Sequence, residues 1–230
     1  MLLSRDQILK HKKSGTIVIE PFNDRNLKTT SYDVTLGPWF WRERSPENRS
    51  SSVHNLYDAD STKAVWSGPF EAEPVGVIEK RLGREFKNIP RDATVVLLEP
   101  GETILGHTLE FIGGRDICVA KMYARSSMGR NFVEVCKDAG WGDVGYFNRW
   151  TMEITNNSRN YSIPLVVGRR IAQMVFYEVA PLDAAKIDYV GEGGKYQTSQ
   201  NLDELKKSWN PHMMVPKMHM DWEVTKKEII

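Results

Sequence analysis

The sequence predicts a mainly β protein, a distorted β-barrel or β-sandwich with short peripheral helices. Two observations lead to this prediction. Several short segments alternate apolar and polar residues or form β-branched runs, which is the pattern of half-buried or buried strands. Turn residues separate these segments at close spacing, as they do in all-β barrels and sandwiches.

The N-terminal segment begins with a predicted helix. Ser4 can cap it and Gln7 follows three residues later, which makes a capping-box pattern, and Gly15 is a plausible end. Residues 16–19 form a β-branched run that predicts a strand, and Pro21 ends it.

The next strand covers residues 31–37, where Tyr, Val and Leu alternate with Asp and Thr. Residues 39–41 extend it after Pro38. From about residue 42 to 92 the pattern weakens, and we predict a long irregular excursion with one or two short strands. A structureless loop of that length is unusual in a compact domain, so this stretch covers a surface or forms a subunit contact.

Regular patterns return at residue 93. Residues 99–102 and the pair at 113–114 are predicted turns. Further strands are expected at residues 94–98, 103–109, 117–120, 150–155, 163–167 and 171–176.

We therefore predict a single domain over residues 1–200 with an insertion at about 42–92, followed by a C-terminal helix and tail at 201–230. Asn201 and Glu204 can cap that helix, which runs through Ser208. The tail is rich in Met and Pro.

Composition excludes several classes of protein. The formal net charge of +1 gives no global signature for nucleic acid or a membrane surface. Neither Cys118 nor Cys136 belongs to a C-x-x-C pair, which argues against a disulfide framework and a structural zinc site. The N-terminus lacks the apolar core of a signal peptide, and no apolar run is long enough to cross a bilayer. We therefore expect a cytoplasmic protein.

The first candidate site is the segment 124–130, which reads Ala-Arg-Ser-Ser-Met-Gly-Arg. Arginine binds phosphate oxygens bidentately, serine hydroxyls donate hydrogen bonds, and glycine allows a close approach to the backbone. This composition suits a polyphosphate. The same heptad also fits a solvated turn with an N-capping serine.

The second candidate site combines the glycine-rich turn holding Asp143 with the predicted strand holding Glu153. Met152 and Ile154 fall on the opposite side of that strand from Glu153. If they face the core, Glu153 points into whatever lies on the other side, which is either a pocket or solvent.

Taken together, these segments resemble the dCTP deaminase family, with gaps, from Leu2 to about Gln200. The matching segments, in the order of the family, are SYDVTLG (31–37), EPGETILGHTLEF (99–111), ARSSMGR (124–130), AGWGDVGY (139–146) with WTMEITN (150–156), and GRRIAQMVF (168–176). The related trimeric dUTPases share the Asp-containing turn. Glu153 favours the deaminase branch. The resemblance implies a dUTPase-like β fold.

The resemblance also implies a role for individual residues. Glu153 is the general acid/base, which takes a proton from water and passes it to the cytosine ring nitrogen. Ser126 holds the attacking water, Arg130 orients Glu153, and Asp143 binds the 3′-hydroxyl. The other substrate-binding positions are Arg125 and Ser127 at the triphosphate, assisted by Lys195 and Tyr196, together with Ala139, Trp141 and Gln200.

The family is trimeric, with active sites between subunits, and binds Mg²⁺ through the triphosphate. The chain lacks the H-x-E and P-C-x-x-C signature of zinc deaminases, so we expect a zinc-free route based on a carboxylate. Burial would raise the pKa of Glu153 and Arg130 would lower it.

Three positions depart from the family pattern. Gly142 stands where Ile is usual, Asn148 replaces a small residue, and Ser199 falls where a glutamine is expected. The leading expectation is deamination of dCTP to dUTP. The alternatives are a bifunctional enzyme or a dUTPase that uses Asp143 and forms dUMP, and a regulatory nucleotide-binding module without catalysis.

Overall fold

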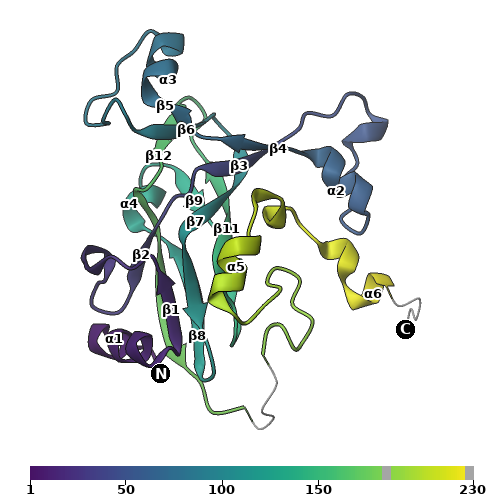
Figure 1. Cartoon of the computed structure of the whole chain (residues 1–230). Helices are drawn as coiled ribbons and strands as arrows, with labels where there is room; N and C mark the ends of the chain where they lie inside the picture. The colour runs from purple at the N-terminus through teal and green to yellow at the C-terminus, as the bar shows by residue number, and fades with distance from the viewer. Residues whose placement is uncertain (183–187, 226–230) are drawn as a thin grey trace.

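The computed structural model describes residues 1–182 and 188–225. It confirms the mainly β prediction (Figure 1). Within these residues the strands form three antiparallel sheets, and the two larger ones pack face to face as a sandwich. Residues 226–230 of the predicted C-terminal tail lie outside the described residues.

The largest sheet has six strands in the order β4-β3-β7-β11-β9, with β1 also paired to β7. All of its pairings are antiparallel. Its strands are β1 (Ile17–Glu20), β3 (Trp39–Glu43), β4 (Trp66–Glu71), β7 (Thr103–Gly114), β9 (Val133–Val135) and β11 (Phe147–Asn156).

A second sheet has four strands in the order β10-β8-β13-β2, and a third has three in the order β12-β6-β5. The four are β2 (Tyr32–Thr35), β8 (Cys118–Ala124), β10 (Trp141–Gly142) and β13 (Arg170–Glu178). The three are β5 (Glu73–Pro74), β6 (Thr94–Leu98) and β12 (Ile163–Val166).

The main core lies between the two larger sheets. Alternate residues of facing strands fill it, including Ile104 and Ile112 of β7, Met152 of β11, and Met174 and Phe176 of β13. Each of these side chains is at most 3% exposed. The two-residue period seen in the sequence therefore identifies the side of each strand that faces the core.

In the described parts of the chain, six α-helices lie around the sheets: α1 (Arg5–Ser14), α2 (Ala59–Val65), α3 (Val75–Leu82), α4 (Ser126–Gly129), α5 (Leu202–Ser208) and α6 (Trp222–Thr225). The predicted cap of α1 is present, because the Gln7 side chain accepts a hydrogen bond from the Ser4 backbone amide at 2.9 Å. The Asn201 cap of α5 is present as well. α1 lies beside β1, and α5 lies along the outer face of the six-stranded sheet (Figure 1).

The C-terminal segment covers this outer face. Leu205 of α5 packs on Phe111 and Phe147, and Met214 packs with Trp41 and Leu105. The six-stranded sheet is thus buried on one face by its partner sheet and partly on the other by residues 202–215. Met214 of the Met- and Pro-rich tail therefore packs on the protein's own core and is only 3% exposed.

Three sequence-based expectations need correction. Residues 39–41 do not extend the preceding strand, because β3 belongs to the six-stranded sheet and β2 to the four-stranded sheet. Gly113 and Gly114 do not form a turn but are the last two residues of β7. Glycine is needed at residue 113 because a Cβ there would lie 1.9 Å from the Tyr146 carbonyl oxygen. These glycines allow two backbones to approach closely. The stretch 42–92, for which one or two short strands were predicted, holds β4 and β5 but also α2 and α3, so it is less irregular than expected.

Candidate active site

Glu153 lies on the outer face of the six-stranded sheet. Its neighbours Met152 and Ile154 are fully buried in the core, which confirms the predicted alternation along β11. Across the sheet, Glu153 is paired with Leu105 of β7, and Leu105 is paired with Trp41 of β3. Directly opposed residues have their Cβ atoms about 5 Å apart. Glu153 therefore belongs to a continuous cross-strand row on this face.

The pKa of the Glu153 carboxyl is raised, chiefly because burial penalises its charged form. A backbone hydrogen bond and the positive charge of Lys137 lower it, but burial dominates. The sequence left this competition open and named Arg130 as the opposing charge. In the structure the opposing charge is Lys137. A carboxyl whose pKa is shifted toward neutrality can both accept and deliver a proton.

The loop that passes Glu153 has a strained backbone. The Cys136 amide donates to the Glu153 carbonyl oxygen at 2.9 Å. Cys136, Lys137 and Asp138 then follow one another with φ of 69°, 36° and 69°, in the left-handed region that non-glycine residues rarely adopt. Such strain is typical of functional sites.

Two residues of this loop, Lys137 and Asp138, were missed by the sequence reasoning. Their side chains are those of an ordinary polar turn, and the run of positive φ values is visible only in the folded chain. Beyond them the loop brings the exposed residues Ala139 and Trp141 to the second sheet, where Trp141 pairs with Lys121 of β8.

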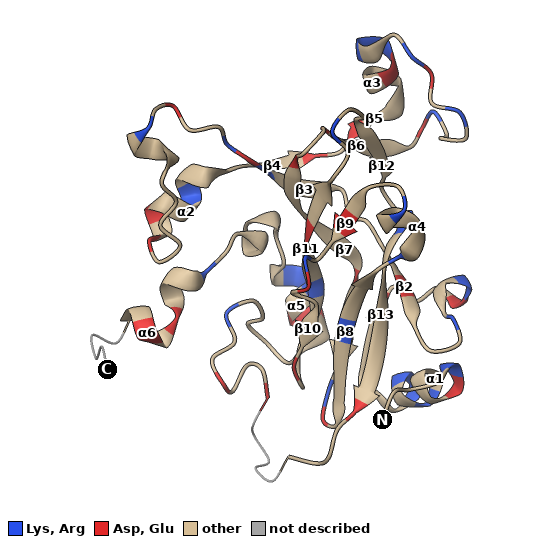
Figure 2. Cartoon of the chain, turned by 180° about the vertical axis from the view of Figure 1, so that it is seen from behind, with Lys and Arg blue, Asp and Glu red and all other residues tan. Residues whose placement is uncertain are grey.

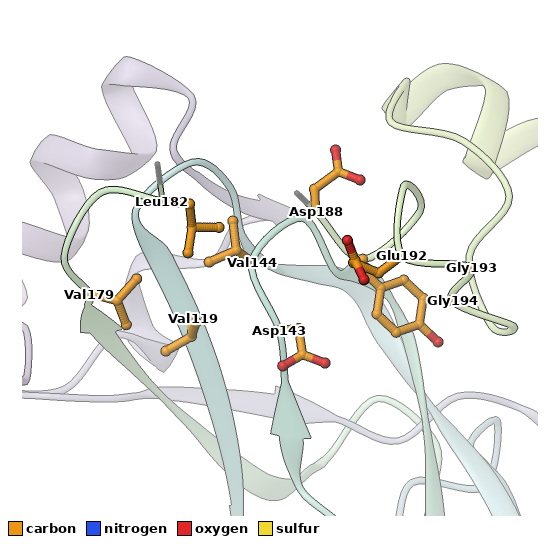
Figure 3. A pocket seen from close by; sticks show the side chains of 10 residues that line it. Val119, Asp143, Val144, Val179, Leu182, Asp188, Glu192, Gly193 and Gly194 are labelled. Carbon is orange, nitrogen blue, oxygen red and sulfur yellow. The ribbon is translucent and has the colours of Figure 1, made fainter. Parts of the chain in front are cut away.

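Asp143 is engaged by Trp141. The Trp141 indole nitrogen donates to the Asp143 carboxylate at 2.8 Å. Asp143 also lines a pocket of about 530 Å³ that has Asp188 and Glu192 on its wall. Figure 3 shows aliphatic side chains on one side of this pocket and the three carboxylates on the other. Three acidic groups repel a triphosphate.

The arginine- and serine-containing segment forms α4 and its flanks. Ser126 and Ser127 are exposed on α4, and the exposed Arg130 follows it. Arg125, which precedes α4, donates to the Arg170 carbonyl oxygen at 3.2 Å and lies 3.9 Å from the Asp33 carboxylate.

The carboxylate pocket and the arginine segment lie at opposite ends of β8. The pocket is lined by Val119 near the start of this strand, and Arg125 follows its last residue. Six residues of extended chain span about 20 Å. One chain therefore does not bring Asp143 and Arg125 to the same place. Within residues 1–182 and 188–225, no hydrogen bond or ion pair joins Glu153 to Ser126 or Arg130 either.

The C-terminal candidates Lys195, Tyr196 and Gln200 have partners in their own chain. Lys195 forms an ion pair with Asp221. The Tyr196 hydroxyl accepts a hydrogen bond from a backbone amide at 3.1 Å, and the Gln200 side chain donates to the Gly145 carbonyl oxygen at 3.1 Å. Tyr196 and Gln200 thus lie beside residues 145–148, where β11 begins, and Lys195 precedes Tyr196 in the chain.

The departures from the family pattern have local explanations. A Cβ on Gly142 would lie 2.5 Å from the Trp150 ring, so glycine makes room for the indole. Asn148 is 2% exposed and its amide donates to the Tyr196 carbonyl oxygen at 2.8 Å, which fixes the C-terminal segment. Ser199 accepts a hydrogen bond from the Asn201 amide at 3.0 Å at the start of α5.

Charged residues of both signs are interspersed along the elements (Figure 2). In the part of the chain that the structure describes, no group of three or more His, Cys, Asp and Glu side chains is arranged to hold a metal ion. None of the described helices has the length and apolar character that a membrane span requires.

Comparison with known proteins decides the family. The model of the dCTP deaminase-like family matches residues 2–179. The chain belongs to the dCTP deaminase-like family. The resemblance inferred from the sequence motifs is confirmed.

Named relatives of this dCTP deaminase-like chain cover nearly its whole length. It is 32% identical over 206 residues to the "dCTP deaminase, dUMP-forming" of Methanococcus aeolicus, covering 87% of this chain and 94% of that protein. It is 31% identical to the "dCTP deaminase" of Halorubrum lacusprofundi, covering 86% of each.

Among solved structures, the 2′-deoxycytidine 5′-triphosphate deaminase of Agrobacterium tumefaciens matches with a TM-score of 0.49 and 15% identity. This match covers 77% of the chain, which spans about half (48%) of that protein.

Proposed function

We propose that this protein hydrolytically deaminates dCTP and releases dUMP as the final product. The observation that carries the first step is Glu153, a half-buried carboxyl with a raised pKa on the sheet face beside a strained loop. The dUMP-forming names of relatives such as those from Methanococcus aeolicus and Dictyoglomus thermophilum favour the bifunctional alternative over dUTP as the end product.

In the first step, Glu153 takes a proton from the attacking water and passes it to the ring nitrogen N3. Hydroxide adds to C4, ammonia leaves, and dCTP and water become dUTP and ammonia. The raised pKa suits both halves of this transfer, because a base near the working pH can also act as an acid. Ser126 holds the water and Arg130 orients Glu153.

We place Ser126 and Arg130 on a neighbouring subunit of a homotrimer, with the active site between subunits. Two observations support this placement. Both side chains are exposed, and within the described part of one chain no hydrogen bond or ion pair joins either of them to Glu153. Residues exposed in the monomer are available to complete a neighbour's site.

The triphosphate contacts Arg125 and Ser127, and it carries Mg²⁺. The guanidinium and hydroxyl groups of this segment are ligands for phosphate oxygens and not for a cation. The donor set therefore fits a magnesium ion held by the nucleotide, which supplies neutralisation of the phosphate charge.

The second step converts dUTP and water to dUMP and pyrophosphate and needs a base for the water that attacks the α-phosphorus. We assign this base to Asp138 in preference to Asp143, which the sequence suggested. Asp138 lies on the strained loop that begins beside Glu153. Asp143 is bonded to the Trp141 indole and shares its pocket with two other carboxylates.

The test is product identification by anion-exchange chromatography after incubation with dCTP and Mg²⁺. Wild type should form dUMP, Glu153→Gln should leave dCTP intact while still cleaving added dUTP, and Asp138→Asn should accumulate dUTP. Glu134→Gln, an exposed glutamate on the adjacent strand β9, is the matched control and should behave as wild type.

Other outcomes would contradict parts of the proposal. Accumulation of dUTP in Asp143→Asn but not in Asp138→Asn would return the second step to Asp143. If wild type accumulated dUTP, the protein would be a deaminase that carries out only the first step and does not form dUMP. If wild type changed neither dCTP nor dUTP, a binding module without catalysis would replace the enzyme.

A further inference from the structure

A second pocket, which we call the arginine pocket, lies between α4, β12 and β13. It has a volume of about 330 Å³ and is lined by Arg125, Arg169 and Arg170 together with apolar residues such as Met128 and Leu165. Sequence reasoning considered only Arg125 among the three arginines. Arg169 and Arg170 come from the turn and first residue of β13.

One buried carboxylate organises these arginines. Asp33 of β2 has a side chain only 5% exposed, lies 2.8 Å from Nη1 of Arg170 and lies 3.9 Å from Nε of Arg125. Arg125 in turn donates to the Arg170 carbonyl oxygen. The two guanidinium groups are therefore held together at fixed positions.

Asp33 cannot neutralise the arginine pocket. Three guanidinium groups face one carboxylate, so the pocket keeps a positive charge. Each guanidinium carries five N–H donors. Arg170 uses one of them on the Asp33 carboxylate, and Arg125 uses one on the Arg170 carbonyl oxygen, so most donors of both groups remain for a ligand. Converging arginine forks of this kind match phosphate oxygens.

The stretch 42–92 supplies a wall of the same pocket. Ile89 lines it, and the Asn88 carbonyl oxygen accepts a hydrogen bond from Arg169 at 2.6 Å. This contact orients the third arginine. It also gives the stretch, whose role the sequence left open, a place at the site.

We propose that Arg169 and Arg170 bind the terminal phosphates of the nucleotide beside Arg125 and set the preference for a triphosphate. This inference rests on the proposed function, in which Arg125 contacts the triphosphate, and extends it to two further residues. The arginine pocket then distinguishes the triphosphate of dCTP from the diphosphate of dCDP and the monophosphate of dCMP.

The experiment compares kcat and KM for dCTP, dCDP and dCMP in wild type, Arg169→Gln and Arg170→Gln. Loss of a charge-assisted contact should raise KM for dCTP on the order of 10- to 100-fold while changing kcat/KM for dCMP little. The matched control is Arg159→Gln, an exposed arginine on the turn between β11 and β12, which should leave all three substrates unchanged.

A purely structural role predicts a different pattern. If both variants lowered kcat/KM by the same factor for all three nucleotides, or left KM for dCTP unchanged, the inference would be overturned. Arg170→Gln leaves the Asp33 carboxylate without its 2.8 Å partner, so the double variant Asp33→Asn/Arg170→Gln is measured as well. This double variant should have the thermal stability of wild type and should still show the raised KM for dCTP.

A binding measurement separates this inference from the proposed function. Inorganic tripolyphosphate is titrated into wild type and Arg170→Gln by calorimetry. Weaker binding to the variant supports the arginine pocket as a phosphate site, even if wild type does not deaminate dCTP. Equal binding to the two proteins overturns the inference, even if deamination is established.

Discussion

His107 provides the sharpest test of the energetics of this fold. It is fully buried on β7, and a Cβ on Gly37 would lie 2.0 Å from its ring. Its Nδ1 lies 2.8 Å from the Thr108 carbonyl oxygen, so Nδ1 must carry the proton. Nε2 then accepts a hydrogen bond from the Trp39 amide at 3.3 Å. Protonation of Nε2 would replace this hydrogen bond by a repulsive contact between the Nε2 hydrogen and the Trp39 amide hydrogen.

The structure lowers the pKa of His107 from 6.5 to about 4, chiefly by burial. Below pH 6.5 His107 is protonated in the unfolded chain, whereas in the folded chain it stays neutral until the pH falls to about 4. Stability is therefore lost as the pH falls through this window. At about 1.4 kcal/mol for each pH unit, the total loss is about 3 kcal/mol, and about 2 kcal/mol of it is reached near pH 5.

The assay is urea unfolding of wild type and His107→Gln near pH 8 and near pH 5. Other groups with shifted pKa values, such as the raised carboxyls of Glu110 and Glu153, act in both proteins and cancel in the difference. The stability advantage of wild type should shrink by about 2 kcal/mol at the lower pH. A difference that stays constant within about 0.5 kcal/mol would refute the reasoning. The exposed His54→Gln is the control.

Three further predictions concern packing and the C-terminal segment. Gly142→Ala should cost about 1–3 kcal/mol in chemical denaturation because its Cβ would overlap a buried indole, whereas Gly76→Ala, in open space on α3, should cost nothing. Met214→Ala should cost about 2–4 kcal/mol in the same assay, since Met214 fills a buried cluster. Asp221→Asn releases Lys195 from a partly exposed ion pair and so frees it to contact the triphosphate. This variant should lower KM for dCTP roughly two- to five-fold. An unchanged KM would exclude a contact between Lys195 and the triphosphate.

The strands could be predicted from the sequence because their signal is local. Alternation around Glu153 placed Met152 and Ile154 in the core, and the structure agrees. The same local reasoning failed at Gly113, where glycine serves a close approach to Tyr146, a contact between residues far apart in the chain. It also missed α3, although Gly83 at its C-terminal end, with φ of 63°, is an ordinary helix stop.

The candidate site was predictable in its residue types and less so in its spatial grouping. Glu153 could be found from its place in a strand, but the charge that opposes its burial could not, since Lys137 reaches it only through a left-handed loop. Arg170 escaped notice because its importance comes from Asp33, 137 residues away. An ion pair between residues so far apart in the sequence cannot be predicted from the spacing of neighbouring residues.

The cross-strand row that holds Glu153 is also packed by a part of the chain that the family match does not include. That match ends at residue 179, whereas Met214 packs on Leu105, the direct cross-strand neighbour of Glu153. Trp41, next in the same row, donates its indole hydrogen to the Pro211 carbonyl oxygen at 2.8 Å. Because burial is what raises the pKa of Glu153, we expect the C-terminal segment, which packs on Leu105 and Trp41 of this row, to contribute to the protonation behaviour of the proposed base.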